Sequence, residues 1–374
     1  MKKRLILFCF LLVFFQTVSD FAFASQQYDD FISYQFIDIE YPDHKLIDKF
    51  HSEYTSGFGL KKLRETLERA APYRPYIRRK LSEKGMPLCL EYLPIIESNF
   101  NTKALSKSGA TGLWQFMENS IEGYLTKDEW LDERKDPWLS TEAALNKLLE
   151  NYNYFKDWGL ALAAYNIGRG GLSQIIKKTG LSSVWELIDG GFLKTETMNY
   201  VPKFIAIADI VTNASYYDLD LPDYDESKEL KFSTITITEQ IGFEQLSQLS
   251  DVNIKELELL NPALTYPVTP YGRTYTLRIP KGSEEAVANA IAHLSNFAAD
   301  IYIVKQGDTL WGISRRYGLT VKELCDTNNI AETDILRIGT KLFVPIYKST
   351  SLINVLKHVQ RGCFICQQKA RKKP

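Results

Sequence analysis

Apolar residues recur with a helical period through much of the first half of the chain. Leu60, Leu63 and Leu67 follow the spacing i, i+3, i+7, which predicts an amphipathic helix. The segment 141–150 shows the same kind of pattern and predicts another helix. Residues 45–215 contain no succession of alternating, strand-like positions, so we expect this region to be all-α.

The pattern changes after residues 218–231, which are polar, acidic and proline-containing, as linkers often are. Residues 232–238 then alternate between apolar and polar side chains, which predicts a strand. The window 253–257 parallels the window 320–324: each begins with Asn or Thr and has Glu three residues later, the pattern of a capped helix start. We therefore predict an internal repeat in the second half of the chain.

The N-terminus has the order of features found in secretory signals. Lys2-Lys3-Arg4 precede an apolar core at 5–15, which is shorter than the roughly 20 residues of a membrane span. Ala22-Phe23-Ala24 then fits a cleavage site. We predict a signal peptide at 1–24 and an exported, periplasmic protein; an uncleaved anchor and an association with the membrane stay open as alternatives.

Charge and residue usage narrow the function. The chain has 45 basic and 46 acidic residues, so no global positive field attracts a nucleic acid, and we predict no such partner. No phosphate-binding glycine loop and no metal-ligand spacing is present, so no metal or organic cofactor is predicted. Cys89 and Cys325 lie in apolar helical contexts and are expected in cores. Cys363 and Cys366 form a C-x-x-C in a basic tail, where a local disulfide is an open alternative.

The strongest candidate for chemistry is Glu97, which follows the apolar run Leu93-Pro-Ile-Ile. A carboxyl group among apolar side chains resists ionisation, so its pKa rises toward the range that suits a general acid. The alternative is an ordinary glutamate at a helix end, facing water. Spacing alone does not exclude a second carboxylate, and the candidates are Glu118, Glu122 and Glu142.

Four windows occur in a fixed order: Glu97-Ser98, Ser106-Lys-Ser-Gly-Ala-Thr-Gly-Leu-Trp-Gln115, Ala164-Tyr165-Asn166-Ile-Gly168 and Glu196-Thr-Met-Asn-Tyr200-Val201. Together they resemble the catalytic domain of the SLT-type lytic transglycosylases over about residues 45–215. Trp114 departs from the wider family, in which methionine is frequent at that place. The resemblance implies a lysozyme-like fold and cleavage of the glycan strands of peptidoglycan, without a cofactor.

The resemblance also implies a role for each matching residue. Glu97 would protonate the leaving oxygen and then act as base toward the C6 hydroxyl of N-acetylmuramic acid, which closes a 1,6-anhydro ring. The cleft residues implied are Ser106, Gln115, Tyr165, Asn166, Glu196 and Tyr200, with Glu196 as a support for the cleft. Four of these have a structural alternative. Ser106 could be a hydroxyl in a turn, Gln115 an amide at a helix start, and Tyr165-Asn166 a packing pair at a helix end. At the level of the protein, a goose-type lysozyme-like hydrolase and a non-catalytic wall-binding protein stay open.

The second repeat carries Gly307-Asp308-Thr309-Leu310 near its start, and over residues 301–346 it resembles a LysM module. That resemblance implies a βααβ fold that binds N-acetylglucosamine-containing glycans. The sugar would lie along this turn and the loop 330–335, with Ile335 as a contact. The first repeat has Gln240-Ile-Gly242 in place of the turn, so we interpret it as a degenerate unit, structural or weakly binding.

The chain is thus predicted to be a multidomain protein: an all-α lysozyme-like domain followed by small α+β, βααβ modules. The expected order is a signal peptide (1–24), the catalytic domain with a helical lead-in (25–217), a linker (218–231), the first repeat (232–281), a connecting helix (282–300), the second repeat (301–346) and the basic tail (347–374).

Overall fold

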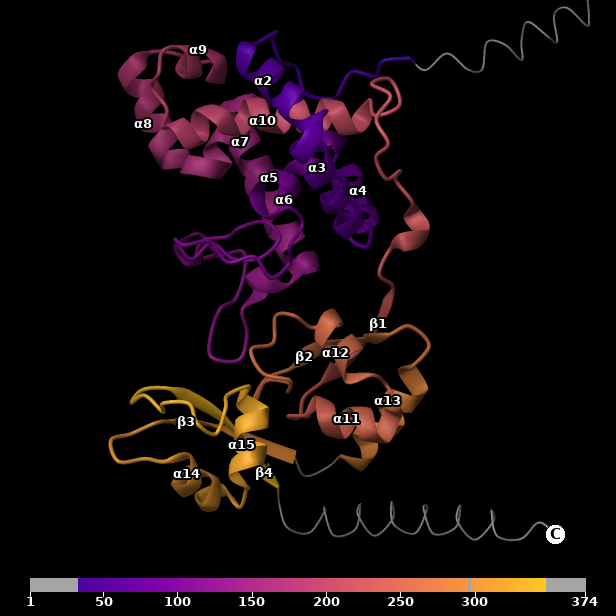
Figure 1. Ribbon diagram of the computed structural model, residues 1–374, viewed down its shortest axis with the longest axis vertical. Coiled ribbons are helices and arrows are strands. Elements are labelled where there is room, and N and C mark those ends of the chain that lie inside the picture. Colours follow the sequence, from indigo (N-terminus) through magenta and orange to yellow (C-terminus); the bar gives the residue numbers. More distant parts are fainter. Residues whose placement is uncertain (1–32, 295–296, 348–374) are drawn as a thin grey trace, which may run out of the picture. The chain divides into compact units, whose positions relative to one another are not determined.

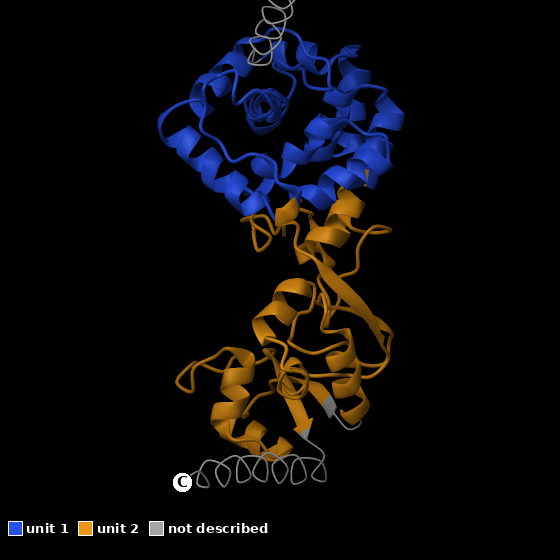
Figure 2. Ribbon diagram, turned by 90° about the vertical axis from the view of Figure 1, so that its right-hand side faces the viewer, with its two compact units in different colours: residues 1–100, 146–226 blue, residues 101–145, 227–374 orange. Residues whose placement is uncertain are grey.

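The computed structural model describes residues 33–294 and 297–347 (Figure 1). The predicted signal peptide and the Cys363–Cys366 tail lie outside these residues. The described chain forms two compact units, shown in Figure 2. Unit 1 contains the chain up to Phe100 together with Asn146–Glu226, and unit 2 contains Asn101–Leu145 and the chain from Ser227 onward.

Unit 1 is helical, as predicted (Figure 1). The helix expected around residues 60–70 is α3, and the one expected at 141–150 lies within α6, which begins in unit 2 and ends in unit 1. The elements are α2 (Lys45–Tyr54), α3 (Gly57–Ala70), α4 (Arg74–Glu83), η1 (Leu88–Tyr92), α5 (Leu93–Ser98), α6 (Pro137–Phe155), α7 (Trp158–Ile167), α8 (Arg169–Thr179), α9 (Val184–Asp189) and α10 (Thr195–Thr212).

The central helix of unit 1 is α10, which packs against α2, α5, α7 and η1. From Tyr200 to Ile210 nearly every side chain on it is buried. Burying one large aliphatic or aromatic side chain contributes roughly 1.5–3 kcal/mol. The run of buried residues therefore fixes the position of α10, and with it the side chains on its first two turns.

The segment 101–136 in unit 2 is built mainly from turns, although the sequence pattern predicted an all-α region. Two short 3₁₀ helices, η2 (Glu118–Ser120) and η3 (Glu133–Lys135), alternate with isolated antiparallel bridges. Thr111 bridges both Leu105 and Phe116, and Lys127 bridges Asp132. Glycines with positive φ, such as Gly109 and Gly112, permit these reversals.

The remainder of unit 2 confirms the predicted repeat of βααβ modules. Each repeat has one antiparallel strand pair with two helices between its strands, and each has a separate apolar core. Phe232 pairs with Pro280 in the first repeat, and Ile301 pairs with Phe343 in the second. The elements are η4 (Glu226–Lys228), β1 (Phe232–Ile237), α11 (Phe243–Ser250), α12 (Ile254–Leu260), β2 (Tyr275–Pro280), the connecting α13 (Glu284–His293), β3 (Phe297–Ile303), α14 (Leu310–Tyr317), α15 (Val321–Asn328) and β4 (Lys341–Tyr347).

An asparagine at the end of the second helix closes each repeat in the same way. The Asn261 side chain donates to the Arg278 carbonyl (2.7 Å) and accepts from the Arg278 N–H (2.9 Å). Asn328 makes the same pair of bonds with Phe343, at 2.8 and 2.7 Å. The predicted capping box is complete at Thr320, whereas the first repeat forms only its Asn half, at Asn253.

Candidate active site

Glu97 lies in the last turn of the short helix α5. Pro94 occupies the first turn of this helix, where its missing N–H costs nothing. The helix ends one residue after Glu97, because Asn99 and Phe100 both have left-handed backbone conformations (φ 51° and 55°). The Phe100 N–H bonds back to the Pro94 carbonyl (3.2 Å), and the Phe100 ring is buried. The backbone on both sides of Glu97 is therefore fixed.

The Glu97 carboxyl group is half-buried, and its pKa is raised to about 7. The largest cause is desolvation, which disfavours the charged form. The charge of Glu196 raises the pKa further, whereas a hydrogen bond from Tyr200 and the charge of Lys147 lower it. Desolvation outweighs these, so the predicted upward shift is present and Glu97 holds a proton up to about neutral pH.

Tyr200 and Glu196 lie one helical turn apart on the same face of α10. The Tyr200 hydroxyl donates a hydrogen bond to Oε1 of Glu97. Tyr200 is buried, and burial together with the Glu97 charge raises the pKa of its hydroxyl, which therefore stays a donor. Glu196 is exposed and acts on Glu97 through its charge. A supporting role for Glu196 in the cleft stays a prediction.

Tyr165 and Asn166 come from the end of α7. The Lys147 ammonium, from α6, lies 5.4 Å from the centre of the Tyr165 ring. Burial, and after it the Glu97 charge, raises the pKa of the Tyr165 hydroxyl. Asn166 accepts a hydrogen bond from the Thr197 hydroxyl (2.7 Å), which ties α7 to α10. Lys147 and Thr197 are additions that the sequence motifs did not single out, since each resembles an ordinary helix residue in the sequence.

Ser106 and Gln115 belong to unit 2, where both stabilise turns. Ser106 Oγ accepts the Ala110 N–H (2.9 Å), so the alternative of a turn hydroxyl describes its local bonding. Gln115 stands in a tight turn with φ 50°, not at a helix start, and its amide donates to the Gly112 carbonyl (2.8 Å). A non-glycine residue at positive φ is uncommon and is often held at a functional site.

Arg134 holds the turn that carries these two residues. Its guanidinium makes two 2.8 Å bonds to Asp132 and also reaches the carbonyls of Gly109 (3.2 Å) and Phe116 (3.4 Å). A Cβ on Gly112 would lie 1.8 Å from the Arg134 carbonyl oxygen, so only glycine fits there.

Trp114, the departure from the wider family, is fully buried. Its indole N–H donates to the Thr141 hydroxyl (2.8 Å). Trp114 therefore joins the turn to the start of α6. Its indole is larger than the methionine found in the wider family, and Thr141 gives the indole N–H a hydrogen-bond partner.

The other candidate carboxylates, Glu118, Glu122 and Glu142, all lie in the part of the chain that forms unit 2. Glu118 pairs with Lys127, and Glu122 is exposed. Among the described residues of unit 1, Glu196 is a carboxylate whose charge acts on Glu97.

In the second repeat, the predicted turn is partly engaged within the module: Gly307 and Thr309 are exposed, Asp308 is half-buried and Leu310 is buried. Asp308 accepts hydrogen bonds from the Tyr302 hydroxyl and the Lys305 N–H, both at 2.7 Å. Thr309 caps α14, and Leu310 is in the core of the repeat. Gly307 has φ 84°, as the turn requires. Two large apolar side chains that face solvent in this repeat are Ile335, at 86% exposed, and Trp311, at 64%. The sequence motif did not indicate Trp311 as a contact.

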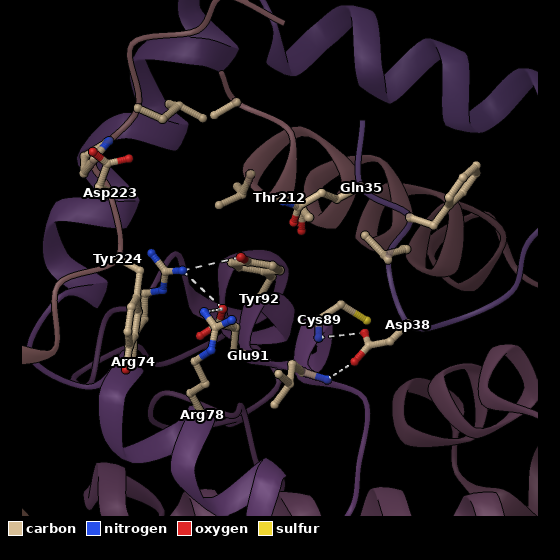
Figure 3. A pocket seen from close by; sticks show the side chains of 17 residues that line it. Gln35, Asp38, Arg74, Arg78, Cys89, Glu91, Tyr92, Thr212, Asp223 and Tyr224 are labelled. Carbon is tan, nitrogen blue, oxygen red and sulfur yellow. Dashed lines mark hydrogen bonds and ion pairs between the residues drawn. The ribbon is translucent and has the colours of Figure 1, made fainter. Parts of the chain in front are cut away.

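Unit 1 also has a pocket of about 360 Å³ that does not include Glu97 (Figure 3). Arg74 and Arg78 from α4 converge on the buried carboxylate of Glu91, each at 3.2 Å. The Tyr224 ring lies over both guanidinium groups. Asp38 accepts from the Cys89 N–H (3.0 Å) at the start of η1. The two guanidinium groups thus pair with the buried Glu91 carboxylate within unit 1.

Within the described ranges, no three His, Cys, Asp or Glu side chains are grouped as a metal site would need. No helix in the same ranges has the length and apolarity needed to cross a bilayer.

Comparison with known protein families agrees with this architecture. Residues 75–188 match the transglycosylase SLT domain, residues 231–296 match the LysM-like domain of the lytic transglycosylase MltD, and residues 302–345 match the LysM domain. The SLT match spans Glu97, Ser106, Gln115, Tyr165 and Asn166, whereas Glu196 and Tyr200 follow it.

Among curated proteins, the chain is 31% identical over 287 residues to membrane-bound lytic murein transglycosylase D of Escherichia coli (strain K12). That alignment covers 72% of this chain and 62% of the relative, so the chain spans less than two thirds of the relative's length. A putative tributyltin chloride resistance protein of Alteromonas sp. (strain M-1) is 38% identical over 104 residues, 27% of this chain and 50% of that protein. A probable N-acetylmuramidase of Lactococcus lactis subsp. cremoris is 54% identical over 43 residues, 12% of this chain and 10% of that protein.

Proposed function

We propose that this chain, which carries a transglycosylase SLT domain followed by two LysM-type domains, is a lytic transglycosylase acting on peptidoglycan. The bond cleaved would be the β-1,4 bond between N-acetylmuramic acid and N-acetylglucosamine, leaving 1,6-anhydromuramic ends. The observation that carries the proposal is the half-buried Glu97, which keeps its proton near neutral pH at the position of the SLT motif.

In the first step, Glu97 would protonate the glycosidic oxygen as that bond breaks. A pKa of about 7 suits this role, because the acid is still protonated near neutral pH and yet gives up its proton readily. The hydrogen bond from Tyr200 orients Oε1, so we assign the proton transfer to Oε2. Tyr165, whose ring lies beneath Lys147, would line the site beside the reacting sugar.

In the second step, the Glu97 carboxylate would take the proton of the C6 hydroxyl as that oxygen attacks C1. The nucleophile belongs to the same sugar, so no water has to be positioned. Holding the hydroxyl in attack geometry supplies much of the rate, since effective molarities reach about 10⁵–10⁸ M in well-oriented intramolecular reactions. Ser106, Gln115 and Asn166 would hold polar groups of the substrate.

The second repeat would bind the glycan of the wall and keep the catalytic domain close to it. With the N-terminal pattern of residues 1–24, this supports an exported protein that works in the periplasm; a link to the membrane is an open part of the proposal. The partner would be the glycan strand itself.

The proposal is tested by Glu97→Gln, which keeps the size of the side chain and removes the transferable proton. Losing the acid and base steps should lower turnover on purified sacculi by several powers of ten, since each role is worth about 10²–10⁴-fold. Binding to sacculi should stay unchanged, which serves as the control for folding. Turnover near that of the wild type would remove Glu97 from its assigned role.

A hydrolase of the same bond is the second candidate, because a lysozyme-like site with a protonated glutamate also suits water as the acceptor. The end group of the product separates the two reactions.

A further inference from the structure

The first repeat uses one loop, residues 261–274 between α12 and β2, to bind segments of its own chain. At one edge of this loop, the Phe243 N–H donates to the Pro267 carbonyl (2.9 Å), and the Thr269 N–H donates to the Ile241 carbonyl (3.0 Å). The buried Thr269 hydroxyl also accepts the Ile241 N–H (2.7 Å). The turn after β1 and the loop before β2 are thus hydrogen-bonded to each other.

The second repeat differs at the same place. Among its described residues, backbone hydrogen bonds join the corresponding two segments only at the strand ends, from the Val304 N–H to Thr340 (2.9 Å) and from the Gly339 N–H to Val304 (2.8 Å). In the first repeat, the backbone groups named above, which lie between these segments, are already used within the fold. A glycan would have to break those bonds to enter.

The other edge of the loop pairs with the hairpin 126–133 of the turn-rich segment. The Thr265 N–H donates to the Trp130 carbonyl (2.9 Å), and the Asp132 N–H donates to the Ala263 carbonyl (2.7 Å). Between these bonds, Leu131 and Leu264 face each other as an antiparallel bridge. The loop therefore adds a short strand to the hairpin.

Side chains strengthen this contact. The Arg278 guanidinium bonds to both carboxylate oxygens of Asp136, which is fully buried, and lies 4.6 Å from the centre of the Trp138 ring. Asp136 also accepts the N–H groups of Trp138 (3.0 Å) and Leu139 (2.9 Å) at the start of α6. A buried carboxylate needs such a partner, so Arg278 compensates a charge that begins the helix.

The contact extends to the turn that carries Ser106 and Gln115. Asp132, whose N–H is held by the loop, binds Arg134 through both carboxylate oxygens. Arg134 in turn holds the carbonyl of Gly109, within the turn. A continuous set of hydrogen bonds therefore leads from the first repeat to this turn.

We propose that the first repeat is a scaffold for the turn-rich segment of the catalytic domain rather than a second sugar-binding module, and that Arg278 is a positioning residue. The inference rests on the proposed function only where it assigns the Ser106–Gln115 turn to substrate binding. It predicts that the loop stays docked on the hairpin during catalysis.

Docking is tested by a cross-link in the full chain with Leu131→Cys and Leu264→Cys. The flanking bonds make this a non-hydrogen-bonded pair, for which Cα atoms lie about 4.5 Å apart. That separation is within the range of roughly 4.4–6.8 Å that disulfides span. We expect the disulfide to form on mild oxidation, as identified by peptide mapping, with turnover on soluble glycan within twofold of the reduced form. Thiols that stay free in the folded chain would overturn docking, as would loss of turnover on cross-linking.

The positioning role is tested by Arg278→Met, with Arg273→Met as the matched control. Arg273, in the same loop, also joins the loop to the hairpin through Asp128 (2.7 Å), but these side chains are 35% and 36% exposed. Because a solvent-exposed ion pair contributes little, we expect its loss to change turnover less than twofold. Arg278→Met should lower kcat/KM on short soluble glycan at least tenfold, while binding to sacculi stays within twofold. Adding Asp136→Asn to Arg278→Met keeps the helix cap but removes the unpaired charge. This double variant should regain part of the lost kcat/KM.

Turnover of Arg278→Met within twofold of the wild type would refute the positioning role, and loss of sacculus binding with intact turnover would show that the repeat binds sugar. If the unaltered protein cleaves no glycan, the proposed function fails. The cross-link then still reports on docking by itself.

Discussion

At the scale of residues, the site depends on the competition between burial and polar contacts at one carboxyl group. Desolvation raises the pKa of Glu97, while the Tyr200 hydroxyl and the Lys147 ammonium favour its charged form. With the resulting pKa of about 7, the Glu97 carboxyl group can both give and take a proton near neutral pH.

This balance predicts the pH dependence of cleavage. The acid step needs protonated Glu97, so kcat on soluble glycan should fall as the pH rises through about 7. Tyr200→Phe removes a hydrogen bond that lowers the pKa of Glu97, so the alkaline limb of the pH profile, where kcat falls, should move to higher pH. Glu196→Gln removes a charge that raises the pKa, so the limb should move to lower pH. The position of the limb, not the absolute rate, is the quantity to measure. Shifts of the same sign in both variants would contradict this account.

At the scale of elements, the turn-rich segment depends on glycines with different roles. Gly109 and Gly112 both have positive φ, at 90° and 82°. A Cβ at Gly109 would meet nothing within 4 Å, whereas one at Gly112 would collide with the Arg134 carbonyl. Gly109→Ala should therefore cost only backbone strain, about 1–3 kcal/mol.

Gly112→Ala adds a steric clash with backbone to the same strain. We expect a larger loss of stability than for Gly109→Ala, measured as the difference in the free energy of unfolding by denaturant titration. Equal losses in the two variants would show that the backbone near Arg134 moves freely, and that the turn is not held as described.

The helices and the repeat could be predicted because their signals are local. Leu60, Leu63 and Leu67 mark α3 by their period, and Thr320 with Glu323 marks a capped helix start that the structure reproduces. The turns of 101–136 were missed because bridges such as that between Thr111 and Phe116 have no periodic pattern. The contacts of Arg278 join residues more than 140 positions apart, so no local pattern could reveal them.

The residues of the candidate site have sequence signals of unequal strength, for the same reason. Glu97 stood out because an acid that ends an apolar run is unusual. Lys147 and Trp311 have no such signal, since one is a lysine on an amphipathic helix and the other a single exposed aromatic residue.

At the scale of the whole molecule, the two repeats are expected to differ in function. The second repeat should tether the enzyme, since a linked binding site raises the local concentration of substrate without changing the bond-breaking step. Removing residues 298–374 should reduce sacculus binding and activity on intact wall, with far less effect on short soluble glycan.

The same test can be made without truncation, by the double variant Trp311→Ala, Ile335→Ala. Both side chains face solvent, so the core of the second repeat is preserved. The double variant should reproduce the loss of sacculus binding seen on truncation. Unchanged binding would place the sugar contact elsewhere on the module.

The central claim is that Glu97 drives an intramolecular transglycosylation, and the masses of the fragments released from sacculi test it most directly. An anhydro end is lighter than a reducing end by one water. We expect full-length protein to release fragments with 1,6-anhydromuramic ends, and Glu97→Gln to release none. Fragments with predominantly reducing ends would contradict the claim and identify the protein as a hydrolase.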